Sequence, residues 1–260
     1  MTKKLLILGG THEAYSLAEY LILNFPSEKL ITVSSLSGAT LNPKIPAGSL
    51  RIGGFGGFFG LKNYLINENI SIIVNATHPY ATQITKNSNA SAKELGIPYF
   101  RLSRPPWKKF CGDQWIDVPS IENASNFLIE NEKSLLNNLS TLNIFLTTGA
   151  RELDFFKKCN SYNFFVRTAD LPKNNTLLPN AKFLQERGKF FFDNEVSLFQ
   201  KYSIKLLITK NSGGSHTYAK IEASRKLNIP IIMIRRPISS SSETCFSLDE
   251  TIELISNIIM

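Results

Sequence analysis

Residues 4–14 read KLLILGGTHEA, an apolar run that ends in two glycines and leads into a sequence suited to open a helix. This order predicts a buried β-strand that turns sharply into a helix. Glycine permits the turn and a close ligand approach because it has no Cβ. The free N–H groups at the start of the helix attract an anion, and we expect this anion to be the pyrophosphate of a cofactor. Gly9 and Gly10 lack the third glycine of the full dinucleotide fingerprint, so a turn without a ligand stays open as the alternative.

The composition indicates a globular protein. Of the 260 residues, 43% are hydrophobic and 19% charged, which suffices for one large domain or two ordinary ones. No apolar run approaches the roughly 18 residues that cross a membrane, and Gly9 cuts the N-terminal run too short for a signal peptide. We therefore expect a soluble cytoplasmic protein with no membrane partner. The three cysteines are isolated in the sequence, so neither a metal site nor a disulfide framework is expected.

The formal net charge of +8 predicts an anionic partner, which could be nucleic acid, a membrane surface or a polyacidic small molecule. The basic residues occur singly or in pairs near expected strand ends, as at Arg101, Arg104 and Arg235. That distribution favours concave binding sites over a nucleic-acid footprint.

The second predicted strand bears on the choice of cofactor. Residues 30–33 read LITV and lead into Ser34, Ser35 and Ser37. In a nicotinamide-binding βαβ unit, an Asp or Glu at the end of this strand holds the 2′-hydroxyl of NAD. Small hydroxyls without an acid favour the 2′-phosphate of NADP, and a polar turn without a ligand is the alternative.

Two further segments carry candidate ligand contacts. Residues 53–57 read GGFGG, a loop whose backbone could surround phosphates or nicotinamide, or could be a flexible lid without contacts. Residues 71–74 predict a buried strand, and Pro79 is expected in the first turn of the next helix. Thr77 and His78 would then lie at the carboxyl edge of the sheet, where open α/β sheets bind ligands. His78 could equally be a hydrogen-bonded turn residue.

The second half of the chain repeats this pattern. Residues 143–151 again combine a strand, a glycine corner and an expected helix start with Arg151, and residues 205–215 run from a strand into a glycine loop. KELGIP at residues 93–98 matches RKLNIP at 225–230, and each is followed by a strand and an Arg-Pro pair. We therefore expect two similar α/β halves with mainly parallel sheets and a cleft lined by strand ends.

Motifs of other enzyme classes do not occur. No tyrosine is followed by a lysine four residues later, Ser16 stands where HExxH requires its second histidine, and neither a Gly-x-Ser-x-Gly elbow nor a Walker loop is present. What is left suits hydride transfer, in which a cofactor supplies the chemistry and the protein positions it.

Five motifs, taken together and in order, resemble the precorrin-6A reductase family of cobalamin biosynthesis over nearly the whole chain. The most distinctive is ATHPYA at residues 76–81. The others are ILGGTxEA at 7–14, RxxRPxW at 101–107, TTGxR at 147–151, and KxSGG at 210–214 with Lys220.

The resemblance implies two Rossmann-like domains, residues 1–112 and 113–260, with the active-site cleft between them. The implied reaction is reduction of one ring double bond of precorrin-6A, or of cobalt-precorrin-6A, to the 6B form with NADPH, NADH being possible. The substrate is a tetrapyrrole with many carboxylates, which gives the +8 charge a partner. An NADP-dependent reductase of another polyanionic metabolite and a non-catalytic nucleotide- or nucleic-acid-binding regulator are the alternatives, and the oligomeric state is open.

The matching motifs also imply site residues. The expected cofactor-binding residues are Gly9, Gly10, Thr11, Glu13, Ser34, Ser35, Ser37, Gly54, Gly56, Gly57 and Thr77. The expected substrate-binding residues are Arg151, Lys210, Ser212, Gly213, Gly214 and Lys220. His78 and Tyr80 are the candidate catalytic proton donors, with water or a substrate group as the alternative.

Overall fold

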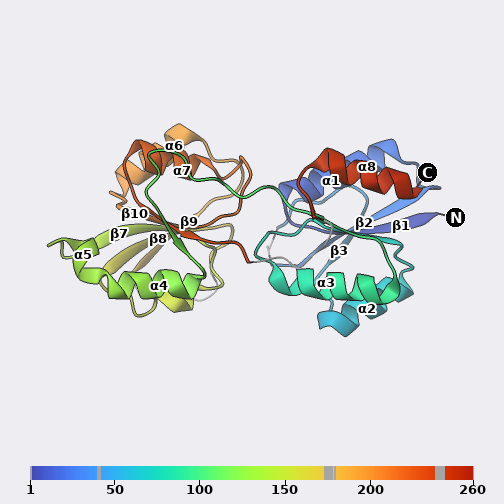
Figure 1. Ribbon diagram of the computed structural model, residues 1–260, viewed down its shortest axis with the longest axis horizontal. Coiled ribbons are helices and arrows are strands. Elements are labelled where there is room, and N and C mark those ends of the chain that lie inside the picture. Colours follow the sequence, from blue (N-terminus) through green and yellow to red (C-terminus); the bar gives the residue numbers. More distant parts are fainter. Residues whose placement is uncertain (1, 40–41, 173–177, 179, 238–243, 260) are drawn as a thin grey trace. The chain divides into compact units, whose positions relative to one another are not determined.

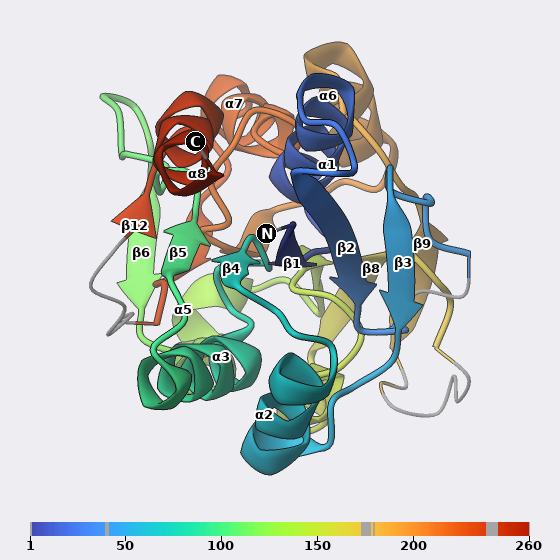
Figure 2. The ribbon, with the colours of Figure 1, turned by 90° about the vertical axis from the view of Figure 1, so that its right-hand side faces the viewer.

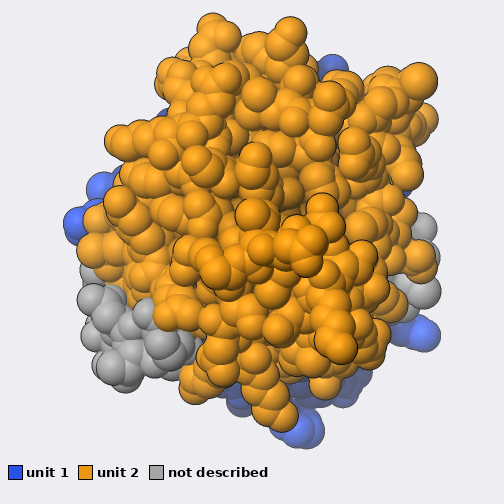
Figure 3. All heavy atoms as spheres, turned by 90° about the vertical axis from the view of Figure 1, so that its left-hand side faces the viewer, with its two compact units in different colours: residues 1–105, 237–260 blue, residues 106–236 orange. Residues whose placement is uncertain are grey.

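The computed structural model of the protein describes residues 2–39, 42–172, 178, 180–237 and 244–259. The chain divides into two compact units, coloured separately in Figure 3: residues 1–105 with 237–260, and residues 106–236. Each unit contains one six-stranded sheet in which all pairs of neighbouring strands are parallel. The predicted fold class, α/β with two Rossmann-like domains, is confirmed. The expected cleft between the domains stays a prediction.

The first unit has strand order β12-β5-β4-β1-β2-β3. Its elements are β1 (Lys3–Leu8), α1 (His12–Asn24), β2 (Leu30–Leu36), β3 (Ser49–Ile52), α2 (Gly57–Asn67), β4 (Ile72–Asn75), α3 (Thr82–Leu95), β5 (Tyr99–Leu102), β12 (Thr244–Cys245) and α8 (Leu248–Ile259). Helices α1 and α8 cover one face of the sheet, and α2 and α3 cover the other (Figure 2).

The apolar run in β1 is continuous because both faces of the sheet are covered. Leu5 and Ile7 pack with Leu17 of α1 and Ile255 of α8 on one face. Their neighbours Leu6 and Leu8 pack against α2 on the opposite face. Successive side chains of a strand point to opposite faces, so the uninterrupted pattern places β1 in the middle of the sheet.

The second unit has strand order β6-β11-β10-β7-β8-β9. Its elements are β6 (Trp115–Val118), α4 (Ile121–Glu130), α5 (Glu132–Leu136), β7 (Leu142–Thr147), the 3₁₀ helix η1 (Leu153–Phe156), β8 (Tyr162–Thr168), β9 (Ala181–Gln185), α6 (Phe192–Lys201), β10 (Leu206–Lys210), α7 (Ala219–Lys226) and β11 (Ile231–Ile234). Figure 1 shows its sheet with α6 and α7 on one side and α4 on the other. Part of its core joins Phe145, Leu207 and Met233 of the sheet to Phe199 of α6 and Ile221 of α7.

Five strands have the same order in the two sheets, β5-β4-β1-β2-β3 and β11-β10-β7-β8-β9, and the sixth strand of each sheet lies at the edge next to β5 or β11. After β5 the chain enters the second sheet as β6, and after β11 it returns to the first sheet as β12. This arrangement corrects the expected second domain of residues 113–260. Residues 244–259 belong to the first unit because β12 pairs with β5, and Ile255 of α8 is buried with residues of α1. The two Arg-Pro pairs of the sequence repeat mark the two crossings.

Two local expectations are also corrected. Pro79 is not in the first turn of a helix: it lies in a turn closed by Ala81 N–H to His78 O (2.8 Å), and α3 begins at Thr82. Arg151 does not open an α-helix, because a turn and then η1 follow β7. Of the helices in the described part of the chain, none is both long and apolar enough to cross a membrane.

Candidate functional site

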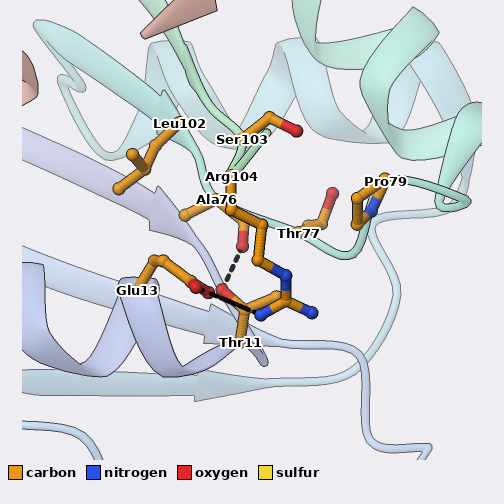
Figure 4. Close-up of a pocket in the computed structure, with 8 residues that line it drawn as sticks. All are labelled: Thr11, Glu13, Ala76, Thr77, Pro79, Leu102, Ser103 and Arg104. Atoms are coloured by element: carbon orange, nitrogen blue, oxygen red, sulfur yellow. Dashed lines mark hydrogen bonds and ion pairs between the residues drawn. The ribbon is translucent and has the colours of Figure 1, made fainter. Parts of the chain in front are cut away.

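The candidate site of the first unit lies at the carboxyl ends of β1, β4 and β5. From β1 the chain builds the sheet toward β2 and β3, and β4 then continues on the other side of β1. Open parallel sheets bind ligands at such a reversal of strand order. A pocket opens at this point (Figure 4) and is lined by Thr11, Glu13, Ala76, Thr77, Pro79, Leu102, Ser103 and Arg104.

Thr11 joins the corner after β1 to the end of β4. Its hydroxyl donates to the carbonyl oxygen of Ala76 (2.6 Å) and accepts from the N–H of Ala14 (3.3 Å), so it caps α1. The N–H of Gly9 donates to the carbonyl of Ser35 on the next strand (2.9 Å). These bonds fix the strand-to-helix corner that the sequence predicted.

Glu13, in the first turn of α1, forms an ion pair with Arg104 of the segment after β5. Arg104 Nη1 lies 3.0 and 3.1 Å from the two carboxylate oxygens (Figure 4). Burial alone would raise the pKa of Glu13, but its own backbone N–H and Arg104 outweigh burial and lower that pKa. The carboxylate is therefore ionised and compensated, although it sits where a helix start would attract an anion.

Glycines leave open space along the carboxyl edge of the first sheet. The pocket beside Glu13 encloses about 10 Å³, room for roughly one water molecule, so a dinucleotide does not fit inside it. Gly10 is exposed with φ +105°, and a Cβ there would meet nothing within 4 Å. Gly54, Gly56 and Gly57 have the same open surroundings at the carboxyl end of β3. These residues fit a phosphate chain that lies over the carboxyl edge of the sheet.

The turn after β4 holds the two predicted proton donors side by side. The rings of His78 and Tyr80 lie 5.5 Å apart, and Tyr80 N–H donates to His78 Nδ1 (3.4 Å). An accepting Nδ1 leaves the proton of a neutral imidazole on Nε2. Thr77 donates its hydroxyl and its N–H to Asn75 Oδ1 (2.8 and 3.1 Å). Both catalytic candidates and Thr77 are thus brought to the predicted edge.

The serines after the second predicted strand differ in position from one another. Strand β2 continues to Leu36, so Ser34 and Ser35 lie within it and are only 2% and 5% exposed. Ser37 follows the strand and is exposed. Arg51 of β3 stands opposite Ser35 in the register, and its Nη1 lies 3.4 Å from the Ser35 hydroxyl.

In the second unit, the structure brings four of the predicted substrate residues together at the end of β10. Lys210 pairs with Glu152 and donates to the carbonyl of Thr148 (3.2 Å). Ser212 and Gly213 are buried in the following loop, and the Gly214 carbonyl accepts from Trp107 Nε1 (2.8 Å).

The other two predicted substrate residues have different surroundings. Arg151 is exposed in the turn after β7. Lys220 is only 5% exposed, and its Nζ donates to the carbonyl of Thr217 (2.8 Å) and lies 4.9 Å from the centre of the Trp107 ring. Its ammonium group therefore supports the loop after β10 in this structure.

Two arginines beside the candidate site were not among the predicted site residues. Arg51 donates to the carbonyls of Gly53 and Gly54 and stacks on Phe55 at 3.8 Å, so it shapes the glycine loop. Arg101, at 3% exposure, donates to the turn of Asn75 and Thr77. Each arginine lies near the carboxyl end of a short strand, and this position could have been recognised in the sequence. Within the described residues, no group of three or more His, Cys, Asp or Glu side chains could hold a metal ion.

Comparison with known proteins matches the chain to one family. The family model described as precorrin-6x reductase CbiJ/CobK matches residues 4–256. Precorrin-6A reductase of Rhodococcus erythropolis is 40% identical over 234 residues, which cover 90% of this chain and 89% of that protein. Cobalt-precorrin-6A reductase of Priestia megaterium is 27% identical over 205 residues, covering 74% and 76% of the two chains.

A solved structure agrees with the fold. CobK precorrin-6A reductase superposes with a TM-score of 0.86 at 31% identity, covering 99% of this chain and 97% of that one. The predicted resemblance is confirmed, and it favours a reductase over a regulator without chemistry. The chain belongs to the precorrin-6x reductase family CbiJ/CobK and is an oxidoreductase of cobalamin biosynthesis.

Proposed function

We propose that the protein reduces one ring double bond of precorrin-6A, or of its cobalt complex, with NADPH. The observation that carries the proposal is family membership over residues 4–256 together with a glycine corner at the strand-order reversal of the first sheet. The nicotinamide group, when bound, supplies the hydride. Gly10, Thr11 and the glycines after β3 hold the cofactor in this proposal, and Lys210 with the loop after β10 receives substrate carboxylates.

Hydride is added to one carbon of the double bond, and the other carbon needs a proton. In this proposal that proton comes from the turn after β4. His78 and Tyr80 are the two side chains there that can donate a proton. Their backbone is held by the Ala81-to-His78 hydrogen bond and by the bonds of Arg101 to the carbonyls of the turn.

The preference for NADPH over NADH rests on the residues around the end of β2. No carboxylate follows this strand to hold a ribose 2′-hydroxyl, and Arg51 places a guanidinium beside Ser35. An arginine in this region of a dinucleotide fold accommodates the 2′-phosphate of NADP. Two relatives named for the metal-free and the cobalt substrate match the chain, so both substrates belong in the test.

The test is anaerobic turnover of precorrin-6A and cobalt-precorrin-6A with NADPH or NADH, by the wild-type protein and by Arg51→Met. We expect faster turnover with NADPH, and for Arg51→Met a KM for NADPH raised about tenfold, since a charged hydrogen bond contributes roughly 1.5–3 kcal/mol. The KM for NADH should rise by a smaller factor, because both cofactors share the glycine loop that Arg51 holds but only NADPH carries the 2′-phosphate.

Lys182→Met is the matched control, because Lys182 of β9 stacks on Tyr202 in the second unit, and it should leave both KM values unchanged. Equal losses with both cofactors in Arg51→Met would contradict the assignment of Arg51. Absence of turnover with either substrate would reject the proposed reaction.

A further inference from the structure

Arg101 carries a buried positive charge that faces no carboxylate in the part of the chain that the structure describes. Its side chain is 3% exposed in β5, and its Nη1 donates to the backbone carbonyl and to Oδ1 of Asn75 (2.8 and 2.7 Å). Nη2 donates to the carbonyl of Thr77 (3.0 Å). None of the ion pairs among the described residues includes Arg101.

Three other arginines that are partly or fully shielded from water each face a carboxylate. Arg104 faces Glu13, Arg167 faces Glu195, and Arg225 faces Asp113. A buried charge without an opposite partner is unfavourable for the fold because the charge loses its hydration. Burial lowers the pKa of Arg101 for the same reason, yet arginine keeps its proton in proteins. The uncompensated charge at Arg101 therefore calls for an explanation beyond folding.

The location of the charge supplies that explanation. The guanidinium group lies beneath the turn that carries Thr77 and His78, next to the pocket at the strand-order reversal. Since Glu13 is already paired with Arg104, it does not offset the charge of Arg101 at this edge of the sheet. The Thr77 carbonyl that Arg101 binds belongs to the same peptide group as the N–H of His78. A hydrogen bond at the carbonyl polarises that N–H toward an acceptor.

We propose that Arg101 is a positioning residue whose unbalanced charge, left by the neutral Asn75, draws an anionic oxygen of the ligand to the turn of Thr77 and His78. The anionic oxygen belongs to a phosphate of the dinucleotide or to a carboxylate of the tetrapyrrole. The inference rests on the proposed function for the identity of these two ligands. Arg101 acts through its electrostatic field and through the polarised peptide group, without direct contact with the ligand, because the N–H groups on Nη1 and Nη2 face protein oxygens.

Asn75→Asp tests the inference, because it balances the charge with almost no change in shape. Oδ1 of residue 75 already lies 2.7 Å from Arg101. In the wild type, Asn75 Nδ2 donates to the hydroxyls of Tyr99 (2.8 Å) and Thr85 (3.0 Å). The substitution replaces this nitrogen with an oxygen, which can only accept. The Tyr99 hydroxyl can donate instead, and the Thr85 hydroxyl can do so by giving up its bond to the Ala81 carbonyl (2.9 Å). Because the new charge pairs with Arg101, the variant is expected to fold with a Tm close to that of wild type.

We expect Asn75→Asp to weaken anion binding about tenfold, a size set by the loss of one unit charge within the protein. Titration with NADPH alone tests whether the anionic oxygen belongs to a phosphate of the dinucleotide. The KM for precorrin-6A at saturating cofactor tests whether it belongs to a carboxylate of the tetrapyrrole. The affected constant should also lose part of its dependence on ionic strength, whereas a purely structural role would not change that dependence. Asn163→Asp is the matched control, because Asn163 is a partly buried asparagine of the second sheet and gains the same charge.

Arg101→Lys and Arg101→Gln keep the inference testable if Asn75→Asp does not fold. The lysine variant retains the charge and should bind the affected ligand within about threefold of wild type, whereas the neutral glutamine variant should lose about tenfold. Unchanged constants in Asn75→Asp, or equal losses in the two Arg101 variants, would overturn the inference. If the wild-type protein binds NADPH but does not reduce precorrin-6A, the proposed function is rejected. The NADPH titration of Asn75→Asp and of the Arg101 variants then still tests the inference about Arg101. Wild-type protein that binds neither ligand would reject both.

Discussion

Gly10→Val is expected to weaken NADPH binding at least about 100-fold. A valine at φ +105° is strained by roughly 1–3 kcal/mol, and its branched side chain occupies the space over the N–H groups where a phosphate would approach. The folded protein has room for the side chain, since a Cβ at this position meets nothing within 4 Å. Fluorescence titration with NADPH measures the affinity, and thermal unfolding measures the strain.

Gly96→Val separates strain from ligand contact. Gly96 caps the end of α3 with φ +66°, and a Cβ there also meets nothing within 4 Å. It precedes β5 and so lies at the opposite edge of the sheet from Gly10. We expect this variant to lower the Tm by a similar amount and to keep NADPH affinity within about threefold of wild type. Normal NADPH binding by Gly10→Val would show that the corner after β1 is not the cofactor site.

Glu195→Gln is expected to destabilise the second unit by about 3 kcal/mol. Glu195 is 1% exposed and binds Arg167 through two hydrogen bonds of 3.0 and 2.7 Å. Arg167 also stacks on Phe145 and Phe190, so it cannot turn toward water without disturbing the core. Removal of the carboxylate charge leaves the guanidinium group with the partly exposed Glu186 as its ion-pair partner. Urea denaturation followed by circular dichroism measures the change in unfolding free energy.

Asp154→Asn is the control for this effect. Asp154 pairs with Lys157, and the side chains are 62% and 51% exposed. The same change from carboxylate to amide should cost less than about 1 kcal/mol, because water screens an exposed pair. Equal losses in the two variants would contradict the importance assigned to burial of the Arg167–Glu195 pair.

The sequence was sufficient to predict the strongly periodic parts of the fold. The apolar run of β1, the glycine corner after it and the repeat that ends in Arg-Pro all depend on neighbours along the chain, and all were found in the structure. Local patterns do not determine which sheet a strand joins, so the return of β12 and α8 to the first unit was missed. Pro79 and Arg151 were placed in helix starts because proline and a glycine corner favour them, but turns follow β4 and β7 instead.

The candidate site was predicted in part, for a similar reason. Thr11, Thr77 and His78 follow strands whose ends could be located in the sequence, and the structure brings them to one edge. Ser34 is buried because β2 runs further than its β-branched residues indicated. The roles of Arg51 and Arg101 depend on strand register and on the carbonyl groups that they face, which the sequence pattern does not specify.

The most direct test of the central claim is transfer of deuterium from NADPH labelled at C4 of the nicotinamide, on the transferred face, to precorrin-6A. Mass spectrometry of the reduced product should show one deuterium per molecule, bound to carbon and retained on exchange into ordinary water. If the reduced product lacks this deuterium, both of its new hydrogens come from the unlabelled solvent. That result would contradict the claim that the protein is a hydride-transferring reductase.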